Sequence, residues 1–158
     1  MPHLRPILLA EDNPNDLELV LTAFQDSQLA NEVIVARDGE EALDYLHGRG
    51  AYAGKGVPAP AVILLDWKMP RVDGREVLRQ VRAHPLLRAT PVVILTSSKE
   101  EVDLLQGYQL GANAYVVKPV GFEDFITTVG RLGFFWALLN EPPPVSPPPL
   151  ASAALHQP

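Results

Sequence analysis

The sequence contains no cysteine, which excludes disulfide bonds, thiolate nucleophiles and sulfur-ligated metals. Basic residues are also scarce, because 13 Lys and Arg stand against 19 Asp and Glu, a formal net charge of -6. This charge disfavours binding to nucleic-acid phosphates and to anionic lipid, so we expect neither partner. The apolar stretch near the N-terminus is too short for a secretory signal or a membrane span. We therefore expect a cytoplasmic protein whose partners are other proteins.

Apolar residues make up 47% of the 158 residues, which is enough for one substantial hydrophobic core. Short apolar runs predict strands at 7–10, 32–36, 61–65, 91–95 and 114–117. Between them, helical periodicity predicts helices at 14–29, 40–47, 75–83, 99–110 and 122–139. Continuously apolar runs are typical of strands buried on both faces. The alternation predicts an α/β fold, a parallel sheet covered by helices.

Residues 1–140 are predicted to form one domain with an extended last helix. The tail at 141–158 is rich in proline, which forbids helix and favours polyproline geometry, so it would act as a linker or dock in a partner's aromatic groove. Large residues make the last helical turns apolar nearly all round: Phe134, Phe135, Trp136 and Leu138. We expect them to form a homodimer interface together with 99–110 and 114–117, unless the tail folds back over them.

Polar residues follow the predicted strands, where ligands bind in an open parallel sheet. Glu11 and Asp12 come after the first strand and Asp66 after the third, while Thr96 and Lys118 follow the fourth and fifth. Neighbouring carboxylates repel one another unless a cation joins them, and oxygen ligands suit Mg2+. A phosphoryl group placed against Asp66 would be neutralised by the metal, the Lys118 ammonium and the Thr96 hydroxyl. Asp66 would then be the nucleophile.

These residues stand in motifs that resemble the response-regulator receiver family over about residues 5–130. The motifs are Ala-Glu11-Asp12-Asn13, Leu-Asp66-Trp-Lys-Met-Pro70-x-x-Asp-Gly74, Leu-Thr96-Ser and Tyr115-x-x-Lys118-Pro119. The resemblance implies a flavodoxin-like, doubly wound five-stranded sheet with strand order 2-1-3-4-5. It also implies a switch that a sensor histidine kinase phosphorylates on Asp66. Such a protein assists its own phosphorylation but is not an enzyme, and it signals to a downstream protein through changed contacts.

The same resemblance implies which atoms bind Mg2+. Asp12, Asp66 and the backbone carbonyl of Lys68 would bind the ion directly, and Glu11 would bind it through water. The chain has Glu11 where many family members have a second aspartate. This difference should be tolerated, because only Asp12 of the two acids binds the metal directly.

The resemblance also implies a switch pair, Thr96 and Tyr115, in which the hydroxyl moves to the phosphate while the ring turns inward. Without the resemblance, Tyr115 would be interpreted as an aromatic residue that fills the core between helix and sheet. The Lys118–Pro119 bond is predicted to be cis, because proline lowers the cost of a cis peptide and a tight turn there could aim the lysine inward.

Three further stretches resemble stand-alone regulators paired with bacterial phytochromes: Glu-Asp-Asn-Pro-Asn-Asp16, His84-Pro-x-x-Arg88-x-x-Pro91 and Phe135-Trp136-x-x-Leu139-Asn140. The phosphoryl donor implied by this narrower likeness is a phytochrome-linked histidine kinase. The downstream protein is not indicated by any residue.

Three other functions are compatible with parts of this pattern. An FMN carrier of the flavodoxin type would need a first loop that cradles phosphate, and Glu11 and Asp12 would repel one. A phosphatase of the haloacid dehalogenase type needs a second acid two residues after the nucleophile, where Lys68 stands. A DNA-binding regulator would need an effector domain, and only the proline-rich tail follows. Signalling through protein contacts is therefore favoured.

Overall fold

The computed structural model describes residues 4–97 and 100–141. Its strands are β1 (Ile7–Ala10), β2 (Val33–Ala36), β3 (Val62–Leu65), β4 (Val92–Thr96) and β5 (Ala114–Val117). All adjacent pairs are parallel, and the sheet order is β2-β1-β3-β4-β5. Both the predicted fold class and the predicted strand order are confirmed.

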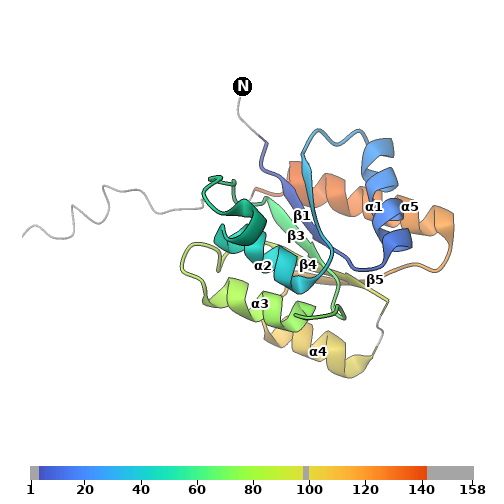
Figure 1. The fold of residues 1–158 in the computed structure, drawn as a ribbon. Coiled ribbons are helices and arrows are strands. Elements are labelled where there is room, and N and C mark those ends of the chain that lie inside the picture. Colours follow the sequence, from blue (N-terminus) through green and yellow to red (C-terminus); the bar gives the residue numbers. More distant parts are fainter. Residues whose placement is uncertain (1–3, 98–99, 142–158) are drawn as a thin grey trace, which may run out of the picture.

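In the described part of the chain, five α-helices cover the two faces of this sheet (Figure 1). They are α1 (Pro14–Asp26), α2 (Gly39–His47), α3 (Gly74–Ala83), α4 (Glu101–Gln109) and α5 (Phe122–Phe134). Figure 1 shows α1 and α5 together on one face, with α2, α3 and α4 on the other. Within the described ranges, no helix is both long and apolar enough to cross a membrane.

Each face of the sheet has its own apolar core, because successive strand residues point to opposite sides. Leu8, Ile63 and Ile94 pack under α2 and α3. Leu9 and Leu64 pack under α1 and α5. Every residue of β1, β3 and β4 is buried, as the continuous apolar runs predicted. Burial of each large aliphatic side chain contributes about 1.5–3 kcal/mol, so the central strands form a rigid platform for the loops that follow them.

The start of α1 agrees with its prediction from the sequence, whereas its end does not. Asn13 caps the helix as predicted, because its side chain accepts hydrogen bonds from the backbone N–H groups of Asn15 and Asp16, and Pro14 occupies the first helical position. The helix was predicted to reach Leu29 but ends earlier, at Asp26. Gln28 has a φ of 57°, in the left-handed region, which is incompatible with a continuing helix.

The last two helices also differ from their predicted ranges. The fourth was predicted at 99–110 and spans Glu101–Gln109, followed by Gly111, whose φ of 99° fits the predicted role of a glycine cap. The α-helical geometry of α5 ends at Phe134, and the chain continues as a π-helical segment, η2 (Phe135–Leu139). The proline-rich residues from 142 to 158 lie outside the described part of the chain.

The segment between α2 and β3 is held in place at both ends. The sequence did not indicate which residues it contacts. Its short 3-10 helix, η1 (Gly50–Tyr52), places the Tyr52 ring edge-on to Tyr45, with the ring centroids 5.0 Å apart. The Tyr45 hydroxyl donates to the Pro58 carbonyl at 2.6 Å. The Arg5 guanidinium donates to the carbonyls that follow, at 59 and 60. The segment is therefore held against α2 and the residues just before β1.

Gly74 fixes how closely α3 approaches the end of β3. A Cβ atom built on Gly74 would lie 2.3 Å from the carbonyl oxygen of Asp66 and 2.9 Å from the Cα of Trp67. Both are backbone atoms, which cannot move aside as a flexible side chain would. The Asp73 side chain caps the same helix by accepting from the Glu76 N–H at 3.0 Å. Only glycine at this position lets α3 start directly against the Asp66 backbone.

We predict that Gly74→Ala lowers the free energy of unfolding by roughly 1–3 kcal/mol, because the new methyl group overlaps the backbone at Asp66 and Trp67. Urea unfolding followed by circular dichroism measures the change. Gly121→Ala is the matched control, since a Cβ there meets only Asp124, at an ordinary 3.7 Å. Equal stability of the two variants would show that the close approach at Gly74 is not a constraint.

Candidate functional site

Three carboxylates meet where β1 and β3 end. Glu11 and Asp12 follow β1 directly, and Asp66 follows β3. The two strands pair in register, with Ala10 opposite Leu65, so the residues after them are neighbours. One carboxylate oxygen from each of the three acids lies within 4.8 Å of the others. Glu11 and Asp66 are buried whereas Asp12 is exposed, so the cluster opens to solvent on the Asp12 side.

The Lys118 side chain reaches this cluster from the end of β5. Its ammonium lies 2.5 Å from Glu11 Oε1, 2.8 Å from Asp16 Oδ2 and 3.4 Å from Asp66 Oδ2. Its side chain is 6% exposed, so these contacts are shielded from water. The structure therefore brings Glu11, Asp66 and Lys118 together, as their positions after the strands predicted.

The charges of the cluster do not balance. Burial lowers the pKa of Lys118, but the hydrogen bonds to Asp16 and Glu11 and the charge of Asp66 outweigh it, so the pKa lies above its ordinary value and the ammonium stays charged. Burial, and then the Asp66 charge, raise the pKa of Glu11, while Lys118 opposes the shift. One ammonium thus faces several carboxylates, which leaves a negative site that suits a divalent cation.

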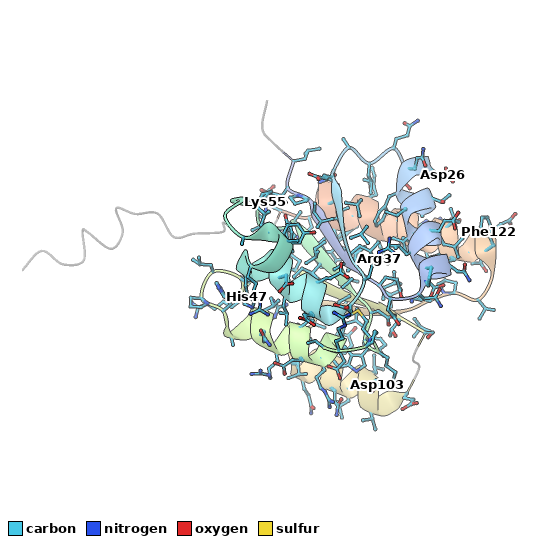
Figure 2. The ribbon with its side chains drawn as sticks, in the orientation of Figure 1. Asp26, Arg37, His47, Lys55, Asp103 and Phe122 are labelled. Carbon is cyan, nitrogen blue, oxygen red and sulfur yellow. The ribbon has the colours of Figure 1, made fainter. Side chains whose placement is uncertain are left out.

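The donor set also fits a divalent cation in kind. Asp12 and Asp66 offer hard oxygen ligands, and Asp12 is open to solvent, which lets a bound ion keep some of its water. Lys68, the predicted carbonyl ligand, lies in the loop after β3. Its ammonium pairs with Glu100 at 3.6 Å and Asp103 at 3.5 Å, and these acids raise its pKa. The Lys68 side chain is thus paired with Asp103 on α4, which is labelled in Figure 2. Only the backbone carbonyl of Lys68 would therefore bind a metal ion.

Thr96 and Tyr115 lie on the two strands beside this cluster. Thr96 is the last residue of β4, is 1% exposed, and pairs in register with Val117, the residue before Lys118. Tyr115 is partly buried and packs against the core under the α3 and α4 side of the sheet. A Cβ on Gly107 would lie 3.1 Å from the Tyr115 ring, so that glycine leaves room for the ring beneath α4.

The predicted cis bond between Lys118 and Pro119 is wrong, because no described peptide bond is cis. The lysine needs no unusual turn to point inward. Its backbone N–H donates to the Thr96 carbonyl at 2.8 Å, which continues the ladder between β4 and β5. From that extended position the long side chain reaches Glu11 and Asp66 directly.

Two acidic residues of this region were given no role by the sequence interpretation. Asp16 was quoted only as part of a motif, yet it binds the Lys118 ammonium. The sequence did contain a signal for this contact. Asp16 lies three residues after the helix cap Asn13, in the first turn of α1, and that turn follows Asp12 closely enough to border the site. Asp103 on α4 pairs with Lys68 in the loop after β3, and nothing in the local sequence indicates that contact.

The residues expected at a dimer interface lie at the end of α5 and in η2. Phe134 is 46% exposed and Phe135 48%. Trp136 is partly buried and packs against the core under α1 and α5, so it is less available than expected. The side chain of Leu138 lies outside what the structure describes.

The two exposed rings line a groove of about 460 Å³ between α5 and the end of α1, where Asp26 and Ser27 form the other wall. The expectation that these rings share a dimer interface with α4 and β5 stays a prediction. α5 packs on the face of the sheet that α1 covers and α4 lies on the opposite face, so the two helices flank the edge strand β5 (Figure 1).

Comparison with known proteins places this geometry in a family. The family model of the response regulator receiver domain matches residues 7–130. The sequence is 38% identical to response regulator Rcp1 of Synechocystis sp. over 130 residues, 82% of this chain and 87% of Rcp1. The crystal structure of the Mn2+-bound form of Rcp1 aligns with a TM-score of 0.82 at 36% identity and covers 89% of this chain and 99% of that one.

Two further solved structures are similar over nearly the whole chain. The phosphorylated cyanobacterial phytochrome response regulator RcpA aligns with a TM-score of 0.82 at 36% identity, covering 90% of this chain and 100% of that one. The bacteriophytochrome response regulator AtBRR is 61% identical, with a TM-score of 0.71 and a coverage of 89% and 100%. Among these similar proteins, one has thus been seen with a divalent metal and another in a phosphorylated form.

Proposed function

The chain belongs to the response-regulator receiver family, and on that basis we propose that it is a single-domain response regulator that accepts a phosphoryl group on Asp66. The observation that carries the proposal is the setting of this one carboxylate. Asp66 Oδ2 lies 3.4 Å from the Lys118 ammonium and shares a cluster with Glu11 and Asp12. A carboxylate in such a cluster can act as a nucleophile, because the lysine and a bound cation can neutralise the charge of the phosphoryl group that it accepts.

The proposed reaction is a phosphoryl transfer from a phosphohistidine. An Asp66 oxygen attacks the phosphorus, the phosphorus–nitrogen bond breaks, and the histidine leaves with its electron pair. The Lys118 ammonium and the Thr96 hydroxyl stabilise the charge on the transferred oxygens. The ion would be Mg2+, held by Asp12, Asp66 and the Lys68 carbonyl with Glu11 behind a water, and it would neutralise phosphoryl charge.

The partner that supplies the phosphoryl group is proposed to be a sensor histidine kinase in the cytoplasm. A phytochrome-linked kinase is favoured, because RcpA is a cyanobacterial phytochrome response regulator and AtBRR a bacteriophytochrome response regulator. The chain itself would act as a switch rather than as an enzyme with a diffusing substrate. Its net charge of -6 supports output through protein contacts rather than through nucleic acid.

The proposed output begins at Thr96 and Tyr115. Movement of the Thr96 hydroxyl toward the phosphoryl group would open space at the end of β4, and the Tyr115 ring would turn further inward. The ring already borders Gly107 on α4, so its movement would alter how that helix packs. Several apolar side chains on the outer side of α4 are exposed and would present the change to a partner: Val102, Leu105 and Tyr108.

We predict that Asp66→Asn abolishes the alkali-labile phosphorylation that acetyl phosphate or a sensor kinase produces. An amide cannot form the acyl phosphate that a carboxylate forms. Radiolabel retained after gel filtration measures the product. Asp73→Asn is the matched control, because it lies in the same loop and asparagine caps α3 as well as aspartate does. Undiminished labelling of the Asp66 variant would disprove the assignment.

We further propose that the chain forms a two-fold dimer through the groove between α1 and α5. Phe134 and Phe135 line this groove and together leave two large rings in contact with water. Burial of each ring would contribute about 1.5–3 kcal/mol. Gly130 also lines the groove, and a Cβ on it would lie 2.5 Å from Ser27 Oγ, so this glycine lets α5 pack closely against the end of α1.

We predict that the wild type sediments as a dimer at micromolar concentration and that the double variant Phe134→Ser, Phe135→Ser sediments as a monomer. The control is Leu86→Ser, which removes an equally exposed apolar side chain between α3 and β4, where it lines a separate pocket beside Tyr45 and Leu46 of α2. Analytical ultracentrifugation distinguishes the species. A wild type that stays monomeric, whether phosphorylated or not, would rule out the dimer.

A further inference from the structure

Asp16 makes a contact that the proposed phosphoryl chemistry does not use. Its Oδ2 atom lies 2.8 Å from the Lys118 ammonium, closer than Asp66 Oδ2 at 3.4 Å. The ammonium has three N–H donors, and Glu11, Asp16 and Asp66 are three acceptors for them. A phosphoryl oxygen that accepts from Lys118 therefore competes for the ammonium with the carboxylates already bound to it.

The first turn of α1 directs Asp16 toward the lysine. In a capping box, the side chain at the third helical position turns back to the backbone N–H of the capping residue. Here the Asn13 N–H already donates to Glu11 Oε2 at 3.1 Å. The Asn13 side chain in turn holds the backbone N–H of Asp16, also at 3.1 Å. The Asp16 carboxylate is thus freed from capping while its backbone is held in place, and it reaches across to Lys118.

The three acceptors differ in how readily they can release the ammonium. The Glu11 and Asp66 side chains are 2% and 10% exposed, whereas that of Asp16 is 28% exposed. A buried carboxylate that loses its ion-pair partner is left desolvated and unpaired, which costs free energy. A carboxylate nearer the surface can be hydrated instead, so the same loss costs less. Asp66 itself carries the phosphoryl group, so of the two acceptors that remain carboxylates Asp16 is the one whose release costs least.

We propose that Asp16 is a positioning residue that holds Lys118 in the unphosphorylated protein and releases it when a phosphoryl group occupies Asp66. Asp16 thereby competes with the phosphoryl group for the same ammonium and shifts the balance toward the unphosphorylated form. This inference rests on the proposed function for its consequence, but the contact between Asp16 and Lys118 can be tested without it.

The experiment compares Asp16→Asn with the wild type in binding beryllofluoride, a phosphoryl analogue, at saturating Mg2+. Trp67 is buried directly beside Asp66, and its fluorescence reports occupancy when Trp136 is replaced by Phe in all proteins. Loss of the carboxylate charge weakens the hold on Lys118, so we expect Asp16→Asn to bind beryllofluoride about five- to tenfold more tightly. Asp16→Glu keeps the negative charge, so its affinity for beryllofluoride should lie close to that of the wild type.

Glu18→Gln is the matched control, because Glu18 is exposed on the same helix and the substitution removes the same charge. Its affinity for beryllofluoride should stay near that of the wild type. The same tightening in both variants would mean that long-range charge, not the contact with Lys118, sets the affinity. Weaker binding by Asp16→Asn would overturn the proposal, since Asp16 would then support the phosphorylated form.

A second measurement separates this inference from the proposed function. In metal-free protein, the Lys118 ammonium should give a slowly exchanging signal in 15N NMR, and Asp16→Asn should speed its proton exchange severalfold while Glu18→Gln does not. Failure of the wild type to bind beryllofluoride would count against phosphorylation of Asp66, and the NMR comparison would still decide the role of Asp16. Unchanged exchange in Asp16→Asn would show that Asp16 does not hold the lysine.

Discussion

The structure depends on one buried ammonium that lies among carboxylates at the edge of the sheet. Removing charges from water is costly unless they are paired, and Lys118 is the cation that makes the burial of Glu11 and Asp66 tolerable. The pairing is incomplete, because Asp12 and Asp16 add further negative charge nearby. That surplus is what makes the site receptive to a divalent ion and, with the ion, to a phosphoryl group.

The scaffold holds these charges through backbone contacts more than through side chains. The ends of β1 and β3 are in register, the N–H of Lys118 joins β5 to β4, and Gly74 brings α3 against the Asp66 backbone. The apolar cores on both faces leave the strands little freedom to move. A change at the site is therefore expected to appear where packing is looser, around Tyr115 and α4.

Sequence reasoning succeeded where the pattern is local. Continuous apolar runs identified the buried strands, and the positions directly after them identified Glu11, Asp66 and Lys118. It failed where distant segments decide the outcome. The Lys118–Pro119 bond is trans where a cis bond was predicted, and the contact between Asp16 and Lys118 joins residues 102 positions apart. The surroundings of the exposed rings likewise depend on which face α5 covers, which no local pattern gives.

The most direct test of the account is to locate the phosphoryl group chemically. Protein treated with acetyl phosphate is reduced with borohydride, which converts an acyl phosphate to an alcohol, and peptide mass spectrometry then identifies the altered residue. The account predicts conversion of residue 66 to homoserine when Mg2+ is present and none when a chelator is in excess. Conversion at another acid, or equal conversion of Asp66 without the metal ion, would contradict it.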